Sequence, residues 1–425
     1  MSKKSKLTSK LFIIVSIVFV LFVTGVVLLA NRERIRPKTD IVFYGIPDNQ
    51  AAIISAEIQK LTDRKGKPVN YRFTSLDTSK SLQSQLRKKY DAVITYIGKS
   101  SEDAAAFTGS KTEKVAADIK LAKGMTLATS AVIQKTPEGK VSAMPLLTDV
   151  YEALINIPQK GSAASDFTDW TALENFVMES KAEFLSPILF ASSDPKTLTD
   201  ITGILLLTIE GKENYYKKAQ ALRETISNTP QEDLEKSLSY FAGENLTEEV
   251  KKFVSWTKKD LIPRKFLSYD KESVLYLMEK ASPSIVFLTL SDHRTVKQDV
   301  IEQYKSIPEY TGESHSYFPA EQGVSSLNLI SPTICFVPLS TSKNAQDALD
   351  HLMMPSVQES LARRTGLAPV LAACSTPDIQ SSDAQYWVAA SEAPVAPLSS
   401  YSFSSSHEME IFSNVIKEQV ESLVK

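Results

Sequence analysis

The chain has 425 residues, of which 43% are hydrophobic and 23% are charged, and its formal net charge is −2. This composition is ordinary for a globular protein, and the near-neutral charge gives no electrostatic basis for binding nucleic acid. Two cysteines, Cys335 and Cys374, are too few for a disulfide scaffold. They either pair in an oxidising compartment or remain two buried free thiols.

The N-terminal part carries the strongest local signal. The run that begins at Leu11 and ends at Ala30 has no charged side chain and follows four lysines. At about 1.5 Å per residue, a helix of this length spans roughly 30 Å, the thickness of a bilayer's hydrocarbon core. Asn31 stands where a lipoprotein signal requires cysteine, and Leu28 disfavours cleavage after Ala30. We therefore predict an uncleaved signal anchor, with residues 1–37 forming a cytoplasmic tip, a membrane span and a stalk.

A β-α-β-α-β pattern follows the stalk. Short apolar segments at 40–44, 69–73 and 91–96 predict strands, and the segments between them, including 79–89, predict helices. This order is typical of a parallel sheet with helices on its faces, and ligands of such sheets bind beyond the carboxyl ends of the strands. The residues at those ends are Tyr44, Asp48, Asn49, Tyr96 and Lys99.

Helical periodicity dominates the middle and the end of the chain. Apolar faces predict helices over about 168–181, 246–261 and 407–424. Another predicted helix has Pro355 at its first position and Gly366 just past its end, the usual start and stop residues. Helices are therefore predicted to dominate the middle of the chain, and a last amphipathic helix is predicted at its end.

Two apolar segments and one polar segment complete the pattern. Residues 284–290 predict a strand that ends at Asp292 and His293, and residues 327–339 predict another strand. The stretch 375–406 is rich in Ser, Ala and Pro, and we predict an irregular surface segment there.

The sequence contains fragments of catalytic and metal-binding motifs, but the remaining residues of each motif are missing at the required spacing. The segment GKS at 98–100 resembles the end of a phosphate-binding loop, but Val93 stands where that loop requires glycine. The pair HE at 407–408 lacks the second histidine of a zinc-protease helix, because position 411 is Ile. The four histidines share no metal-ligand spacing. We predict no catalytic residue, no metal, no cofactor and no enzymatic activity.

Five segments in order resemble the extracellular solute-binding proteins of ABC importers, specifically the maltose-type sugar-binding family. The resemblance covers roughly residues 40–425. The matching segments are the opening strand and polar loop (40–49), the strand before a binding loop (91–100), the hinge sequence GKVSAMPL (139–146), the helix start DWTAL (169–173) and the helix pair at 345–370.

This resemblance implies a bilobed α/β fold of the periplasmic-binding-protein type II class, whose cleft closes on a ligand by hinge motion. Lobe one would comprise 38–147 plus 322–358, and lobe two 148–321 plus 359–425. The resemblance also implies a small polar ligand such as a sugar, permease subunits in the membrane as partners, and an extracytoplasmic body. Two functions stay open: a membrane-anchored receptor that feeds an ABC permease, or a sensor, scaffold or surface-interaction protein without transport.

The expected ligand site combines the strand-end residues of lobe one with residues of lobe two. Asp149 follows the Pro-Leu pair of the hinge sequence by three residues. Asp292 and His293 follow a strand at the place where the family carries a stacking tryptophan. Ser192 and Ser193 complete the second group. The residues assigned to structural packing rather than to ligand stacking are Trp170, Trp256 and Trp387.

Overall fold

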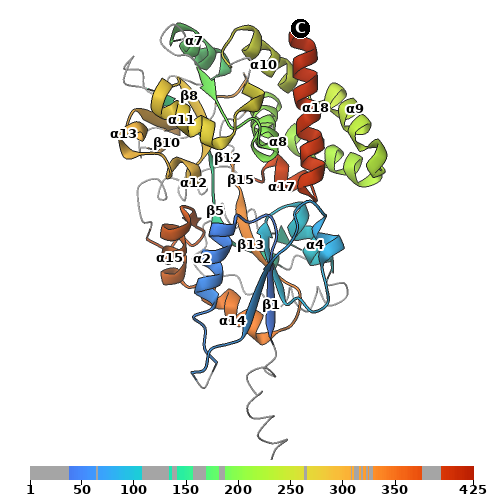
Figure 1. Cartoon of the computed structure of the whole chain (residues 1–425), viewed down its shortest axis with the longest axis vertical. Helices are drawn as coiled ribbons and strands as arrows, with labels where there is room; N and C mark the ends of the chain where they lie inside the picture. Colours follow the sequence, from blue (N-terminus) through green and yellow to red (C-terminus); the bar gives the residue numbers. More distant parts are fainter. Residues whose placement is uncertain are drawn as a thin grey trace, which may run out of the picture.

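The computed structural model describes residues 38–63, 66–107, 134–135, 141–156, 169–180, 187–262, 266–307, 309–310, 315–316, 319–321, 324, 329–375 and 394–425. Among these residues no helix is both long and apolar enough to cross a bilayer, and the predicted anchor lies outside them. The described residues form a mixed α/β fold with two principal sheets and a separate hydrophobic core on each (Figure 1).

Lobe one, the lower body in Figure 1, is built on the larger sheet. Its described strands lie in the order β14-β5-β13-β3-β1-β2, with β4 paired to β5. Strand β1 pairs in parallel with β2 and β3, as the β-α-β-α-β pattern predicts, whereas β13 runs antiparallel to β3 and β5. The elements are β1 Thr39–Phe43, α2 Asp48–Ile58, β2 Tyr71–Ser75, α3 Leu82–Gln85, β3 Ala92–Tyr96, α4 Lys99–Phe107, β4 Gln134–Lys135, β5 Val141–Thr148, β13 Thr333–Pro338, α14 Lys343–Leu352, α15 Pro355–Thr365 and β14 Ala368–Pro369.

Lobe two, the upper body, contains a smaller sheet in the order β7-β8-β6-β9 and most of the helices. Its elements are β6 Tyr151–Asn156, α7 Trp170–Ser180, β7 Ile188–Leu189, α8 Pro195–Asn228, α9 Leu234–Asn245, α10 Thr247–Lys258, α11 Lys271–Ala281, β8 Ile285–Thr289, α12 Leu290–His293, α13 Gln298–Ile301, β9 Tyr304–Ile307, β12 Leu329–Ile330, β15 Pro394–Val395, α17 Leu398–Ser402 and α18 Ser406–Val424. Short 3₁₀ turns lie at Gln231–Asp233 and Phe266–Ser268, and Glu309–Tyr310 (β10) pairs with His315–Ser316 (β11).

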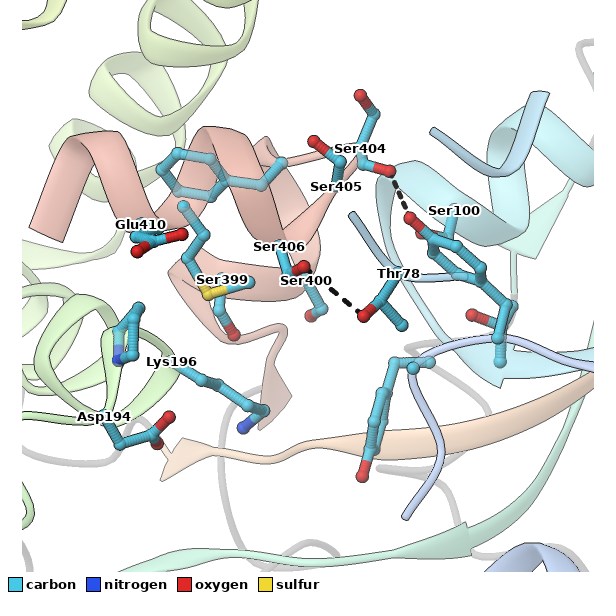
Figure 2. Close-up of a pocket in the computed structure, with 17 residues that line it drawn as sticks. Thr78, Ser100, Asp194, Lys196, Ser399, Ser400, Ser404, Ser405, Ser406 and Glu410 are labelled. Atoms are coloured by element: carbon cyan, nitrogen blue, oxygen red, sulfur yellow. Dashed lines mark hydrogen bonds between the residues drawn. The ribbon is translucent and has the colours of Figure 1, made fainter. Parts of the chain in front are cut away.

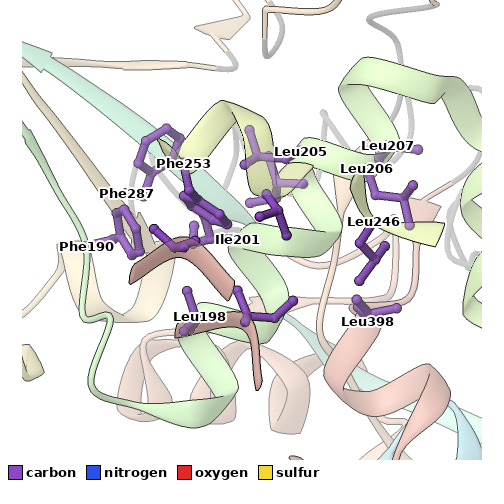
Figure 3. Close-up of a cluster of buried hydrophobic side chains, with 14 of the residues drawn as sticks. Phe190, Leu198, Ile201, Leu205, Leu206, Leu207, Leu246, Phe253, Phe287 and Leu398 are labelled. Carbon is purple, nitrogen blue, oxygen red and sulfur yellow. The ribbon is translucent and has the colours of Figure 1, made fainter. Parts of the chain in front are cut away.

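The core of lobe two lies between its sheet and helices α8, α10, α17 and α18. Leu198, Ile201 and Leu205 of α8 meet Phe253 of α10 and Leu398 of α17 in one buried cluster (Figure 3). Because helix α17 contributes to this core, the C-terminal part of the chain is fixed to lobe two.

Two of the three tryptophans confirm the packing role predicted for them. Trp170 and Trp256 are fully buried, and their ring centroids lie 5.6 Å apart. Their indole N–H groups donate to Thr208 and Glu174 inside lobe two. Trp387 lies outside the described residues.

The chain passes between the lobes along two neighbouring segments that form a hinge. The amide of Asp149 donates to the carbonyl of Pro332 at 2.8 Å, and the Ser331 hydroxyl donates to the carbonyl of Asp149 at 2.8 Å. The expected lobe boundary between residues 358 and 359 falls inside α15, which packs against α2, and β14 then pairs with β5. Both α15 and β14 therefore pack on lobe one.

Other local predictions differ from the structure in instructive ways. The helix expected at 79–89 is reduced to α3, because Leu86 is already extended. The strand expected at 327–339 is interrupted at the hinge into β12 and β13. The surface segment expected at 375–406 is wrong for α17, where Leu398 and Ser402 are 1% exposed.

The cysteines are free thiols in separate clusters. Cys335 is buried in β13, and Cys374 is buried near Pro355, whose carbonyl lies 3.5 Å from its sulfur. Burial raises the pKa of the Cys335 thiol well above its usual value and that of the Cys374 thiol to about 11. Both thiols therefore remain protonated at neutral pH and have low reactivity.

Candidate functional site

The carboxyl ends of β1 and β3 form the edge of lobe one that faces lobe two. The two strands are parallel neighbours, and the amide of Tyr44 donates to the carbonyl of Ile94 at 3.0 Å. Tyr44 and Tyr96 therefore leave the sheet at the same edge. Opposite them lie the start of α8, the end of β8 and helix α17, all from lobe two.

A cavity of about 530 Å³, here called the hinge-side cavity, lies between the lobes beside the hinge. Lobe one contributes Asn49 and Tyr96, and lobe two contributes Asp149, Lys196 and Asp292. Its charged lining residues are Asp149, Asp194, Asp292, Lys196, Lys271, Arg294 and Arg364. The cavity is therefore strongly polar, with both signs of charge represented.

A second cavity of about 300 Å³, here called the serine cavity, adjoins the first (Figure 2). Lobe one lines it with Tyr44, Thr78 and Ser100, and lobe two lines it with Phe403 and a group of serines between residues 399 and 406. Residues that line both cavities are Gly45, Tyr96, Asp194 and Lys196. The two cavities are therefore adjoining parts of one inter-lobe cleft.

Lys196 stands at the junction of the two cavities. Its ammonium nitrogen lies 5.8 Å from the ring centroid of Tyr96 on lobe one and 5.7 Å from that of Tyr151 on lobe two. Burial opposes its charge, but the Asp200 carboxylate, 3.0 Å away, outweighs burial and holds the pKa of Lys196 well above its usual value. The cleft therefore has a permanent cation between two aromatic faces.

Asp200 organises this junction from inside lobe two. Its carboxylate is fully buried and accepts hydrogen bonds from the Tyr151 hydroxyl at 2.7 Å, from Lys196 at 3.0 Å and from the amide of Ser399 at 3.0 Å. These three donors come from β6, α8 and α17. Asp200 thus fixes Lys196 and the start of α17 relative to β6.

Asp149 lies at the hinge end of the cleft and is 6% exposed. Its carboxylate accepts from the Ser291 hydroxyl at 2.6 Å and from the Val150 amide at 3.0 Å. Burial raises the pKa of Asp149 to about 6, although the bond from Ser291 favours the charged form. Burial likewise raises the pKa of Tyr96 to about 12, so its hydroxyl stays a hydrogen-bond donor at neutral pH.

The structure places five of the ten sequence-predicted residues on the cleft. Asn49, Tyr96, Asp149 and Asp292 line the hinge-side cavity, and Tyr44 lines the serine cavity. Asp292 forms an ion pair with Lys271 there. Ligand contact by these residues stays a prediction.

The other five predicted residues line neither cavity. Asp48 is exposed at the start of α2, and Lys99 forms an ion pair with Asp103 one turn further along α4. The other three, all in lobe two, are Ser192, Ser193 and His293.

These three residues make contacts within lobe two. The amides of Ser192 and Ser193 donate to the carbonyls of Phe190 and Tyr269. His293 is 8% exposed, and its Nδ1 lies 2.7 Å from a carboxylate oxygen of Glu152 in β6. The short helix α12 turns this ring toward the sheet of lobe two.

The sequence interpretation missed Asp194, Lys196 and the start of α17. Asp194 is the N-cap of α8 and accepts from the Thr197 amide at 2.9 Å, and Pro195 is the first helical residue. An Asp followed by Pro is a recognisable helix start, so this signal was present in the sequence. The serines of α17 carried no such signal.

Metal binding has no geometric support in the part of the chain that the structure describes. No group of three or more His, Cys, Asp or Glu side chains there could hold an ion. The chemistry that the cleft offers is therefore hydrogen bonding, aromatic contact and charge pairing.

By sequence, the chain matches no family model and no curated protein. By structure, it is similar to the bacterial solute receptor AcbH, described as preferring β-D-galactopyranose, with a TM-score of 0.63, 11% identity and coverage of 91% of this chain and 98% of that one.

Two further similar structures have known sugars bound. One is a sugar transporter protein from Bacillus licheniformis in complex with stachyose, with a TM-score of 0.59, 14% identity and coverage of 91% and 98%. The other is maltose-bound MalE3 from T. maritima, with a TM-score of 0.57, 11% identity and the same coverage. The chain therefore has the fold of the solute-binding proteins of ABC importers, the type II periplasmic-binding-protein fold.

Proposed function

We propose that the chain is an extracytoplasmic solute-binding protein of an ABC importer, which binds a sugar or a related polar small molecule between its lobes. One observation carries the proposal: Tyr96 of lobe one and Asp149 and Lys196 of lobe two line one polar cavity beside a two-segment hinge. A ligand held there contacts both lobes at once, as expected for a binding site between two hinged lobes.

The chemistry of the cleft favours a neutral, hydroxyl-rich ligand. Lys196 is neutralised by Asp200 and Lys271 by Asp292, so the cavity does not need a charged ligand to balance these cations. Asp149 and the tyrosine hydroxyls supply acceptors and donors for hydroxyl groups, and the ring of Tyr96 supplies a face for C–H groups. The galactopyranose, stachyose and maltose of the similar structures have this same combination of groups.

A ligand screen on the full-length chain in detergent tests this proposal. The fluorescence of the buried Trp170 and Trp256 reports melting while sugars, polyols, amino acids and phosphates are added in turn. A ligand at 100 times its Kd should add about 2.7 kcal/mol of stability. Lys196→Met should reduce the stabilisation to about half or less, whereas Lys217→Met, which changes an exposed lysine on the same helix, should preserve it.

No response to any compound would count against the receptor proposal and favour the sensor, scaffold or surface-interaction alternative. That alternative needs no small ligand, and direct hydrogen bonds between the lobes are the observation that favours it. The screen thus separates the two functions on one preparation.

The membrane anchor is part of the same proposal. The uncharged run at 11–30 and the weak cleavage site after it support a single-pass protein with its body outside the cytoplasm. In that position the lobes can deliver ligand to permease subunits in the same membrane. N-terminal sequencing of membrane-extracted protein should recover the start of the chain, and a mature end near Asn31 would contradict the anchor.

A further inference from the structure

The segment that joins α17 to α18 belongs to lobe two but is hydrogen-bonded to lobe one. The Tyr44 hydroxyl donates to the carbonyl of Ser404 at 2.5 Å. The amide of Ser406 donates to the carbonyl of Thr78 at 2.7 Å, and the hydroxyls of these two residues are 3.3 Å apart (Figure 2). The residues that form these bonds all line the serine cavity.

The groups that lobe two presents in these bonds are held rigidly. Ser405 caps α18, and Glu408 reaches back in a reciprocal capping box. The Glu408 carboxylate also accepts from the amide and the hydroxyl of Ser404, each at 2.8 Å. Because the cap fixes this turn, the Ser404 carbonyl is already oriented toward Tyr44 without further ordering.

Close backbone packing and an ion pair extend the contact. A Cβ atom added to Gly98 of lobe one would lie 2.2 Å from the carbonyl oxygen of Ser400, so only glycine fits there. Beside it, Glu102 of α4 forms an ion pair with Arg223 of α8. Tyr44, Thr78, Gly98 and Glu102 thus give lobe one a continuous contact with lobe two.

We propose that this contact is a latch, consisting of Tyr44, Thr78, Gly98 and Glu102 on lobe one and Arg223, Ser400, Ser404 and Ser406 on lobe two, that keeps the lobes closed with no ligand between them. Every bond in it joins protein atoms directly, so no ligand is needed to complete it. A hinged binding protein that closes only on its ligand requires the ligand to bridge the lobes. The latch goes beyond the proposed function, because it acts whether the protein delivers a solute or serves as a sensor.

Double electron–electron resonance on the full-length chain in detergent tests the latch. Spin labels are placed at Lys88→Cys on lobe one and Glu235→Cys on lobe two, both exposed positions, with Cys335 and Cys374 replaced by Ala. With no ligand added, the inter-lobe distance distribution should be single and narrow. A broad or double distribution in this protein would overturn the proposal.

Latch-breaking variants supply the second arm of the test. Tyr44→Phe removes the hydroxyl that bonds Ser404 across the cleft and the Lys80 carbonyl within lobe one, and Glu102→Gln removes the ion pair. The combined variant should add a population at longer distance. The matched control, Tyr276→Phe with Glu272→Gln, changes two exposed residues of α11 and should leave the distribution narrow. If the latch variant also stays narrow, the latch is not what closes the lobes.

A backbone variant tests the same contact independently. Gly98→Ala places a methyl group against Ser400 and should produce the longer distance even if the double variant folds poorly. Gly66→Ala is its control, because Gly66 also has a positive φ but an added Cβ there meets nothing within 4 Å. Equal distributions for the two alanine variants would contradict the latch.

Discussion

The two lobes contribute to the cleft by different structural means. Lobe one presents Tyr44 and Tyr96 at the ends of parallel strands, a position fixed by sheet topology. Lobe two presents Lys196 from the start of α8, and this side chain depends on Asp200 buried behind it. The strand-end residues of lobe one are positioned by the fold alone, whereas Lys196 of lobe two also depends on one buried partner, Asp200. We therefore expect the lobe-two half of the site to be more sensitive to single substitutions.

The largest expected effect comes from removing that partner. Asp200→Ala leaves the Lys196 ammonium and the Tyr151 hydroxyl without their buried acceptor, and should lower the free energy of unfolding by about 3–5 kcal/mol. Urea unfolding followed by the fluorescence of Trp170 and Trp256, both in lobe two, measures it. Glu279→Ala, which breaks exposed ion pairs, should change the unfolding far less. Equal losses of unfolding free energy in the two variants would contradict the structural role assigned to Asp200.

The next test compares how two buried glutamates, one in each lobe, change the pH dependence of stability. Glu249 of lobe two is fully buried, and burial raises its pKa to about 7. Because the pKa of Glu249 is higher in the folded protein than in the unfolded chain, its protonated form favours folding. This contribution to stability is fully present below the pKa of the unfolded chain and is lost as the pH rises through about 7. Glu249→Gln should therefore stabilise the protein at pH 8 by about 3 kcal/mol, at 1.36 kcal/mol per pKa unit, and change it little at pH 4.

Glu57 of lobe one should behave in the opposite way. Burial acts to raise its pKa, but bonds from Lys60, Ser360 and Arg364 outweigh burial and lower it. Because the pKa of Glu57 is lower in the folded protein than in the unfolded chain, its ionised form favours folding. This contribution to stability is present above the pKa of the unfolded chain and is lost as the pH falls through the pKa of the folded protein. Glu57→Gln should therefore destabilise the protein at pH 7 more than at pH 3. Parallel pH profiles for the two glutamine variants would contradict this comparison.

A third test concerns Asp149 at the hinge. Its pKa of about 6 in the folded protein, raised mainly by burial, implies that its contribution to stability falls as pH rises from about 4 to 6. Asp149→Asn should remove that pH dependence, so the stability difference between variant and wild type should grow by about 2–3 kcal/mol across this range. Urea unfolding at pH 4, 5, 6 and 7 measures it, and a constant difference would refute the assigned environment.

The smallest expected effect lies where the lobes meet beside the hinge. Gly366 ends α15 with φ +77, and an added Cβ would lie 3.5 Å from Cδ of Arg294, an ordinary contact distance. Gly366→Ala should therefore carry only the backbone cost of this conformation, about 1 kcal/mol. A much larger loss in urea unfolding would indicate that the lobes are packed more tightly at this point.

Sequence patterns predicted lobe one better than lobe two. The alternation of strands and helices placed Tyr44 and Tyr96 correctly at one sheet edge, because the topology of a parallel sheet follows from element order. His293 was placed at a strand end by the same rule, but α12 turns its ring toward Glu152 instead. A one-turn helix of four residues leaves too little pattern to be recognised in a sequence.

The C-terminal serines show why the part of the cleft formed by α17 could not be predicted from the sequence. A stretch rich in Ser, Ala and Pro is typical of exposed loops, yet Ser399 is 3% exposed and its amide donates to Asp200. The burial of these small polar residues depends on partners about 200 residues away in the chain. Local composition contains no information about such partners.

The binding of a polar ligand between the two lobes can be measured by calorimetric titration. The best ligand from the screen is titrated into the full-length protein. Asp149→Asn at the hinge and Lys196→Met at the junction should each weaken binding at least about tenfold, or 1.4 kcal/mol. Lys217→Met should bind as the wild type does. Unchanged affinity in both cleft variants would place the ligand elsewhere and contradict binding between the lobes.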